Sequence, residues 1–83
     1  MKKIVILGLH ITDRVKEAIR VQDVLTKFGC SIKTRLGLHE VQENFCSSNG
    51  LIILELTGNA EEMVKLENEL LKIEGLEVQK MTF

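Results

Sequence analysis

The sequence predicts an α+β fold in which a four-stranded antiparallel sheet carries two helices on one face. Three observations support this prediction: four short runs rich in Ile, Leu and Val, two segments with helical periodicity between them, and polar or glycine-containing turns at their boundaries. The resulting order, βαββαβ, is that of the ferredoxin-like sandwich. With 83 residues the chain has room for one core, so residues 1–83 are expected to form a single domain.

The first strand and the first helix follow each other closely. Residues 4–9 form a strand-like apolar run, and Thr12 or Asp13 then supplies the N-cap of a helix. The helix is expected to end at Phe28, because the following Gly29 accepts the left-handed conformation that closes a helix. Spacings of three and four predict its buried face, which comprises Val15, Ala18, Ile19, Gln22, Leu25 and Phe28.

The second half of the chain repeats the pattern. Residues 31–38 alternate as a half-buried strand, the polar residues 40–49 are expected to be a hairpin loop, and residues 51–56 form a third strand. Asn59, with Glu62 three residues later, resembles a capping box and opens a second helix. That helix is expected to end at Gly75, and residues 76–82 alternate as the last strand.

The two central strands of this fold are apolar on both faces. The first strand has Ile4 and Ile6 on one face and Val5, Leu7 and Leu9 on the other. The third strand has Leu51 and Ile53 on one face and Ile52, Leu54 and Leu56 on the other, with Glu55 as the single charge. A bare sheet face would therefore expose about five aliphatic side chains, a patch that monomers rarely tolerate. We expect a homo-oligomer, a dimer or a tetramer, in which a second copy covers this face. The alternative is a monomer whose patch is bordered by long Lys and Arg side chains.

Composition restricts the partners. Eleven basic residues against twelve acidic ones give a net charge of −1, so no basic excess favours direct binding to nucleic acid. The longest apolar run is far shorter than the ~18 residues of a transmembrane span, and no signal segment is recognisable, so we expect a soluble, cytoplasmic protein without membrane contact. Both cysteines are then expected to be free thiols.

Four side chains have the chemistry of transition-metal ligands: His10, Cys30, His39 and Cys46. Their spacings match no local chelate. His39 and Cys46 bracket the predicted hairpin loop and are the candidate metal ligands, either with each other or with a symmetry mate. The alternative is an exposed loop histidine and an unliganded thiol. The chain contains no catalytic constellation and identifies no cofactor, so we expect a protein that is not an enzyme.

Along nearly its whole length the chain resembles the iron-only hydrogenase system regulator family, a group of small ACT-like proteins. The matching segments are Thr12-Asp13-Arg14 after the first strand and residues 32–38, 50–56 and 73–78. The resemblance implies a stand-alone, oligomeric ACT-like module that senses a ligand or regulates a protein partner in a hydrogenase system, without a reaction of its own.

Two departures from related ACT-like proteins matter. Amino-acid-binding ACT domains commonly carry Asp-x-x-Gly after the first strand, whereas here Asp13 is followed by Lys16, which argues against that binding mode. The second departure is from the nickel-responsive repressors, whose ligand spacing is not reproduced by His10, Cys30, His39 and Cys46 and whose DNA-binding segment is missing. The alternative function is a transition-metal sensor similar to the C-terminal domain of these repressors, which would act through a partner.

Overall fold

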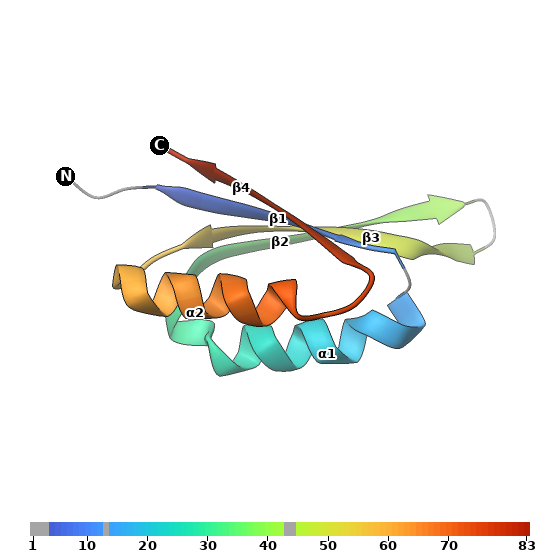
Figure 1. Ribbon diagram of the computed structural model, residues 1–83. Helices are drawn as coiled ribbons and strands as arrows, with labels where there is room; N and C mark the ends of the chain where they lie inside the picture. The colour runs from blue at the N-terminus through green and yellow to red at the C-terminus, as the bar shows by residue number, and fades with distance from the viewer. Residues whose placement is uncertain (1–3, 13, 43–44) are drawn as a thin grey trace.

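The computed structural model describes residues 4–12, 14–42 and 45–83, with the backbone alone for 14–16, 38–42 and 45–49. Two helices lie side by side under a twisted sheet (Figure 1). The elements are β1 (Val5–Ile11), α1 (Arg14–Lys27), the short 3₁₀ turn η1 (Gly29–Ser31), β2 (Ile32–Gln42), β3 (Phe45–Leu56), α2 (Ala60–Leu71) and β4 (Leu76–Thr82).

The sheet has the strand order β2-β3-β1-β4, and all its neighbours are antiparallel. Both helices cover the same face of the sheet (Figure 1). This arrangement confirms the predicted α+β ferredoxin-like fold, with β1 and β3 as the central strands.

The core lies between the sheet and the helices. Alternate residues of the central strands point into it, and the register pairs Leu7 with Leu54 and Leu9 with Ile52. Because the side-chain period of a strand is two, the neighbours of these residues point to the opposite face. The buried apolar residues are Leu7, Leu9, Ile11, Val21, Leu25, Phe28, Leu54, Leu56, Leu66, Leu70 and Ile73.

The buried face of α1 agrees with the predicted one only in part. Leu25 and Phe28 are buried as predicted, and the side chain of Val15 lies outside the described residues. The inward row runs through Glu17, Val21 and Leu25, while Ile19 is 70% exposed and Gln22 is also exposed. A row spaced by four residues can include a glutamate only if its carboxylate finds polar partners inside. Glu17 has such a partner in Thr12, so the inward row includes a residue that hydrophobicity alone would exclude.

The predicted loop at 40–49 is wrong. β2 continues to Gln42 and β3 already begins at Phe45, with a register shift between His39 and Val41. The two strands project beyond the helices as a hairpin arm (Figure 1), and the molecule measures 46 × 21 × 18 Å. The polar composition of residues 40–49 indicated a loop. Pairing between two strands satisfies the hydrogen bonds of backbone N–H and C=O groups even where the side chains are polar.

The second helix begins as predicted. Asn59 has an extended backbone, and its side chain accepts a hydrogen bond of 2.8 Å from the Glu62 backbone N–H. The helix ends at Leu71, earlier than expected, and Gly75 lies in the turn into β4 with a φ of +87°. Within the described part of the chain, neither helix is long and apolar enough to span a membrane.

Candidate functional site

The face of the sheet turned away from the helices is an exposed apolar surface, here called the open face. The register places Ile6 beside Glu55, Gly8 beside Ile53 and His10 beside Leu51, all on this side. Of the eight large hydrophobic side chains exposed among the described residues, five lie on the open face. They are Ile4, Leu36, Leu51, Met81 and Phe83, which are 47%, 52%, 38%, 56% and 74% exposed.

Two charged pairs lie on or beside the open face. Glu55 accepts a hydrogen bond of 3.1 Å from the Thr34 hydroxyl, and the Lys33 ammonium lies 3.8 Å from its carboxylate. Farther along, His10 on β1 contacts Glu77 on β4 through its Nδ1 atom. Strand alternation predicted that Glu55 lies on this face. The pair of His10 and Glu77 could not be predicted, because it depends on which strand lies beside β1.

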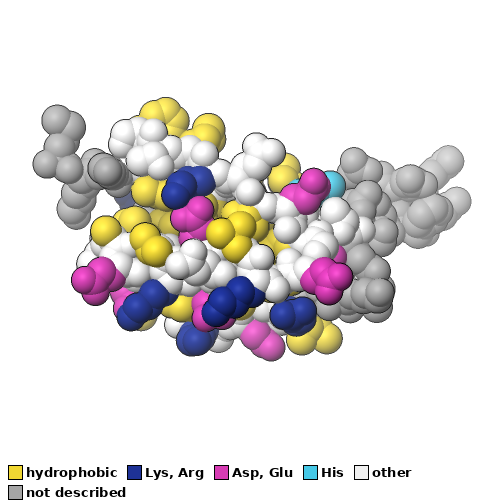
Figure 2. All heavy atoms as spheres, in the orientation of Figure 1, with side chains coloured by type: hydrophobic (Ala, Val, Ile, Leu, Met, Phe, Trp, Pro, Cys, Tyr) yellow, Lys and Arg dark blue, Asp and Glu magenta, His cyan; other side chains and the backbone are white. Residues whose placement is uncertain are grey.

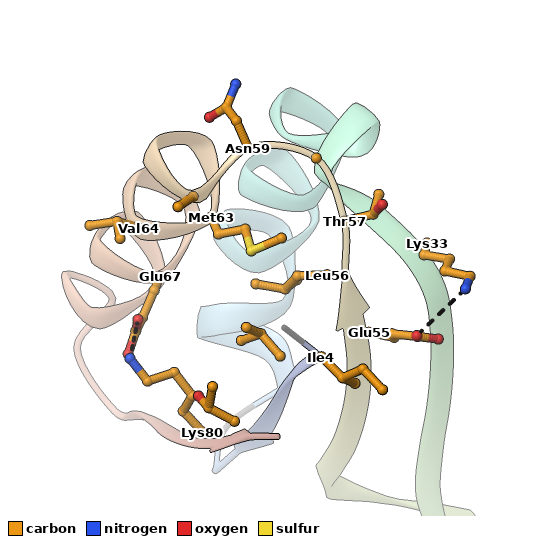
Figure 3. Close-up of a pocket in the computed structure, with 14 residues that line it drawn as sticks. Ile4, Lys33, Glu55, Leu56, Thr57, Asn59, Met63, Val64, Glu67 and Lys80 are labelled. Carbon is orange, nitrogen blue, oxygen red and sulfur yellow. Dashed lines mark hydrogen bonds and ion pairs between the residues drawn. The ribbon is translucent and has the colours of Figure 1, made fainter. Parts of the chain in front are cut away.

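A cavity of about 790 Å³ opens at one end of the sheet, between the start of β1, the end of β3, the first turns of α2 and the end of β4. Figure 3 shows Leu56 and Met63 between the strands and α2, and Ile4 on the side of Glu55. Hydrophobic side chains reach the surface in the band between the sheet and α2, beside basic and acidic ones (Figure 2). The cavity therefore offers an apolar floor with charges at its margin.

Two ion pairs flank the cavity on opposite sides (Figure 3). On one side Lys33 pairs with Glu55, and on the other the Lys80 ammonium lies 3.0 Å from the Glu67 carboxylate. Because Glu55 also belongs to the open face, as does Ile4, the cavity extends around the start of β1 to that face. The two surfaces are continuous.

The junction between β1 and α1 is filled by a buried carboxylate. Glu17 is 5% exposed, and its Oε1 accepts a 3.2 Å hydrogen bond from the Thr12 backbone N–H. The Thr12 hydroxyl lies 3.2 Å from Glu17 Oε2 and donates to the Gly75 carbonyl oxygen at 2.8 Å. Sequence reasoning missed this cluster, since Thr12 and Glu17 are a common pair of residue types and only the fold brings Gly75 to them.

The candidate metal ligands remain a prediction. His39 is the register partner of Gly50 and Cys46 that of Val41, but the side chains of both candidates lie outside the described part of the structure. Of the other two donors, Cys30 is exposed in η1, and His10 is engaged with Glu77. Among the side chains that the structure describes, no three His, Cys, Asp or Glu residues are grouped as a metal site would require.

Comparisons with known proteins support the fold. No family model matches the chain, and no curated protein does. The uncharacterized protein TM1266 from Thermotoga maritima is similar over 99% of both chains, with a TM-score of 0.80 and 26% identity.

Two other solved structures are more distant. CPII, a nitrogen regulatory PII-like protein from Thiomonas intermedia K12 bound to ADP, AMP and bicarbonate, gives a TM-score of 0.57 at 13% identity, over 99% of this chain and 93% of that one. A dimeric ferredoxin-like protein from an uncultured marine organism gives 0.51 at 8% identity, over 98% and 92% of the two chains. These likenesses show a small ferredoxin-like fold of the kind found in PII-like proteins.

Proposed function

We propose that the protein is a non-catalytic, ACT-like regulatory or ligand-sensing module that acts as a homo-oligomer joined through its open face. The observation that carries the proposal is the concentration of exposed large hydrophobic side chains on one face of the sheet. Contiguous exposed apolar patches on monomers are usually small, and larger ones mark interaction surfaces.

The size of the patch is adequate for self-association. Its five exposed side chains and their half-buried neighbours Ile6 and Ile53 present on the order of 400 Å² of surface per copy. Two such patches together supply about 800 Å², which corresponds to the apolar centre of an interface. The polar residues around the patch would complete the roughly 1,200–2,000 Å² of a stable contact.

The regulatory part of the proposal has three supports. The chain resembles hydrogenase system regulators along most of its length, a nitrogen regulatory PII-like protein shares its fold, and a ferredoxin-like neighbour is dimeric. We propose a protein partner in an iron-only hydrogenase system. Co-purification of a tagged copy with hydrogenase maturation proteins from the native host tests this part, and recovery of the tagged protein without them contradicts it.

A substitution on the open face tests the proposed interface. Leu36→Glu places a charge within the apolar contact, beside Ile53 of the central strand β3, so we expect size-exclusion chromatography to show dissociation to monomers. Ile19→Glu is the matched control, because it replaces an exposed aliphatic residue of α1 on the other side of the molecule. Equal association of both variants contradicts an interface at the open face.

The alternative function is transition-metal sensing by His39 and Cys46. Its support is the hairpin arm, whose two paired strands each carry one of the two residues. Titration with nickel or zinc should show stoichiometric binding that His39→Ala abolishes and His10→Ala leaves intact. Uptake no greater than background in the wild-type protein rejects this function.

A further inference from the structure

The sheet has two edge strands, and their edges differ in regularity (Figure 1). The pairing of β2 with β3 shifts register twice, between Ile32 and Thr34 and between His39 and Val41. Such irregularities twist an edge strand and disfavour pairing with a further strand. β4 pairs with β1 along its whole length without a shift, and it contains no proline. The free edge of β4 is therefore a regular template for another strand.

The backbone groups at this free edge follow from the pairing of β4 with β1. Phe83 and Ile4 exchange two hydrogen bonds, so every second residue of β4, counted back from Phe83, bonds to β1. The residues between them, Val78, Lys80 and Thr82, direct their N–H and C=O groups to the other side. No strand of the described chain borders β4 there.

The two charges of β4 are both paired within the chain. Lysine often protects an edge strand because its charge repels a second copy of the same edge. Here the Lys80 ammonium lies 3.0 Å from the Glu67 carboxylate of α2, and Glu77 contacts His10. The free edge of β4 therefore lacks the charge that would keep a second β4 away.

α2 adds apolar surface at the same edge of the molecule. α2 packs on β4, and Glu67 marks the side of the helix that faces this strand. Val64 and Leu71, three residues before and four residues after Glu67, lie on that side and are 52% and 56% exposed. Figure 3 shows Val64 pointing away from β3. Since neighbouring strands lie about 4.8 Å apart, two copies joined at β4 would bring their α2 helices side by side.

We propose that the free edge of β4 pairs with β4 of a second copy, antiparallel and centred on Gln79, so that the two sheets form one continuous sheet. A two-fold axis perpendicular to the sheet then relates the copies, and all helices lie on one face. Val78 of each copy exchanges hydrogen bonds with Lys80 of the other, and the Thr82 N–H donates to the Leu76 carbonyl oxygen. Val64 and Leu71 become covered by the second α2.

Charge selects this register among the possible ones. Centring on Gln79 places Glu77 opposite Met81 and Lys80 opposite Val78, so no like charges face each other. Centring on Lys80 would place two ammonium groups directly opposite, which is destabilising. Centring on Val78 would leave Thr82 beyond the end of the second strand. The surface is thus complementary to itself, which is what an isologous contact requires.

This edge contact is separate from the open face, and its place in a larger assembly rests on the proposed function. An open-face contact and an edge contact, each with its own two-fold axis, close into a tetramer. Backbone hydrogen bonds gain little over those made with water, so the edge contact is the weaker of the two. A variant with a disrupted open face therefore separates into monomers at the dilution of chromatography.

Hydrogen exchange of the wild-type protein, followed by ¹H–¹⁵N NMR, tests the edge contact without any variant. The amides of Val78 and Lys80 should exchange as slowly as that of Gln79, which bonds to β1. At an unpaired edge they should exchange about tenfold or more faster than that of Gln79. In a mixture of labelled and unlabelled copies, a nuclear Overhauser effect between the α-protons of Glu77 and Met81 should confirm the register.

One pair of variants separates the backbone from the side chain. Lys80→Pro removes an outward N–H and leaves the bonds to β1, a change that an edge strand tolerates. Lys80→Ala is the matched control, because it removes the same side chain and the same ion pair with Glu67. Light scattering should give Lys80→Pro half the molar mass of the wild-type protein and Lys80→Ala the full molar mass.

Two results overturn the proposal: fast exchange of the Val78 and Lys80 amides in the wild-type protein, or equal molar masses of Lys80→Pro and Lys80→Ala. Fast exchange in an intact oligomer contradicts the edge contact and leaves the open-face interface standing. Slow exchange in a dimer that Leu36→Glu leaves intact supports the edge contact and contradicts the open face. The two proposals therefore fail in different measurements.

Discussion

Gly75 is the residue at which backbone conformation and side-chain space are both restricted. Its φ of +87° lies in the left-handed region, and a Cβ added there would lie 2.0 Å from Glu17 Oε2. Glu17 cannot easily give way, because it is buried and hydrogen-bonded to Thr12. The turn into β4 and the junction between β1 and α1 therefore depend on each other.

Gly75→Ala is expected to lower the free energy of unfolding by about 3 kcal/mol, from a strained φ and an overpacked contact together. Gly58→Ala is the matched control, since Gly58 has a φ of +89° but nothing within 4 Å of an added Cβ. This variant should lose only the strain, about 1 kcal/mol. Urea unfolding measures both values, and a Gly75→Ala loss no larger than that of Gly58→Ala contradicts the contact.

Glu17→Leu tests whether the buried carboxylate organises the junction. Leucine cannot accept the hydrogen bond from the Thr12 backbone N–H, so this partly buried bond is lost, at a cost of about 1 kcal/mol. Replacement of the exposed Ile19 by Gln on the same helix should change stability by less than about 0.5 kcal/mol. If Glu17→Leu is more stable than the wild-type protein, the Glu17 carboxylate does not organise the junction.

At the scale of single elements, the N-cap of α2 makes a separate prediction. Asn59→Ala removes the acceptor for the Glu62 backbone N–H and should destabilise the protein by about 1 kcal/mol, whereas Asn59→Asp should retain its stability. Asn68→Ala, at an exposed position inside the same helix, should be neutral or slightly stabilising. Chemical unfolding monitored by circular dichroism distinguishes them. Equal losses at positions 59 and 68 would rule out a specific capping effect.

Elements with a clear hydrophobic period were predicted correctly from the sequence. Features that depend on contacts with another element were not. Alternation in β1 and β3 placed Leu7 and Ile6, and likewise Leu54 and Ile53, on opposite faces correctly, because a strand has only two faces. The face of α1 depended on a polar contact to Glu17 that hydrophobicity does not encode. The hairpin arm was missed because backbone pairing there does not require apolar side chains.

At the scale of the whole molecule, the open face followed from alternation, whereas the cavity did not follow from the sequence. Its ion pairs join residues from different elements, Glu67 with Lys80 and Lys33 with Glu55. The second pair lies at the register shift between Ile32 and Thr34, which no sequence pattern marks. A site assembled from β1, β3, α2 and β4 becomes visible only when the sheet order is known.

The open face is the feature that connects the fold to the proposed function. It contains most of the exposed large hydrophobic side chains of the described chain, it borders the cavity, and strand register brings Glu55 to its edge. A contact between copies would bury the apolar side chains and place the cavity next to the interface. The proposed function therefore depends on self-association.

Multi-angle light scattering of the purified wild-type protein at micromolar concentration measures self-association directly. A dimer or tetramer should give a molar mass two or four times the 9.4 kDa of the chain, at a value that holds across dilution. A single homogeneous species of 9.4 kDa would contradict the account, because the open face would then be stable in water without a second copy.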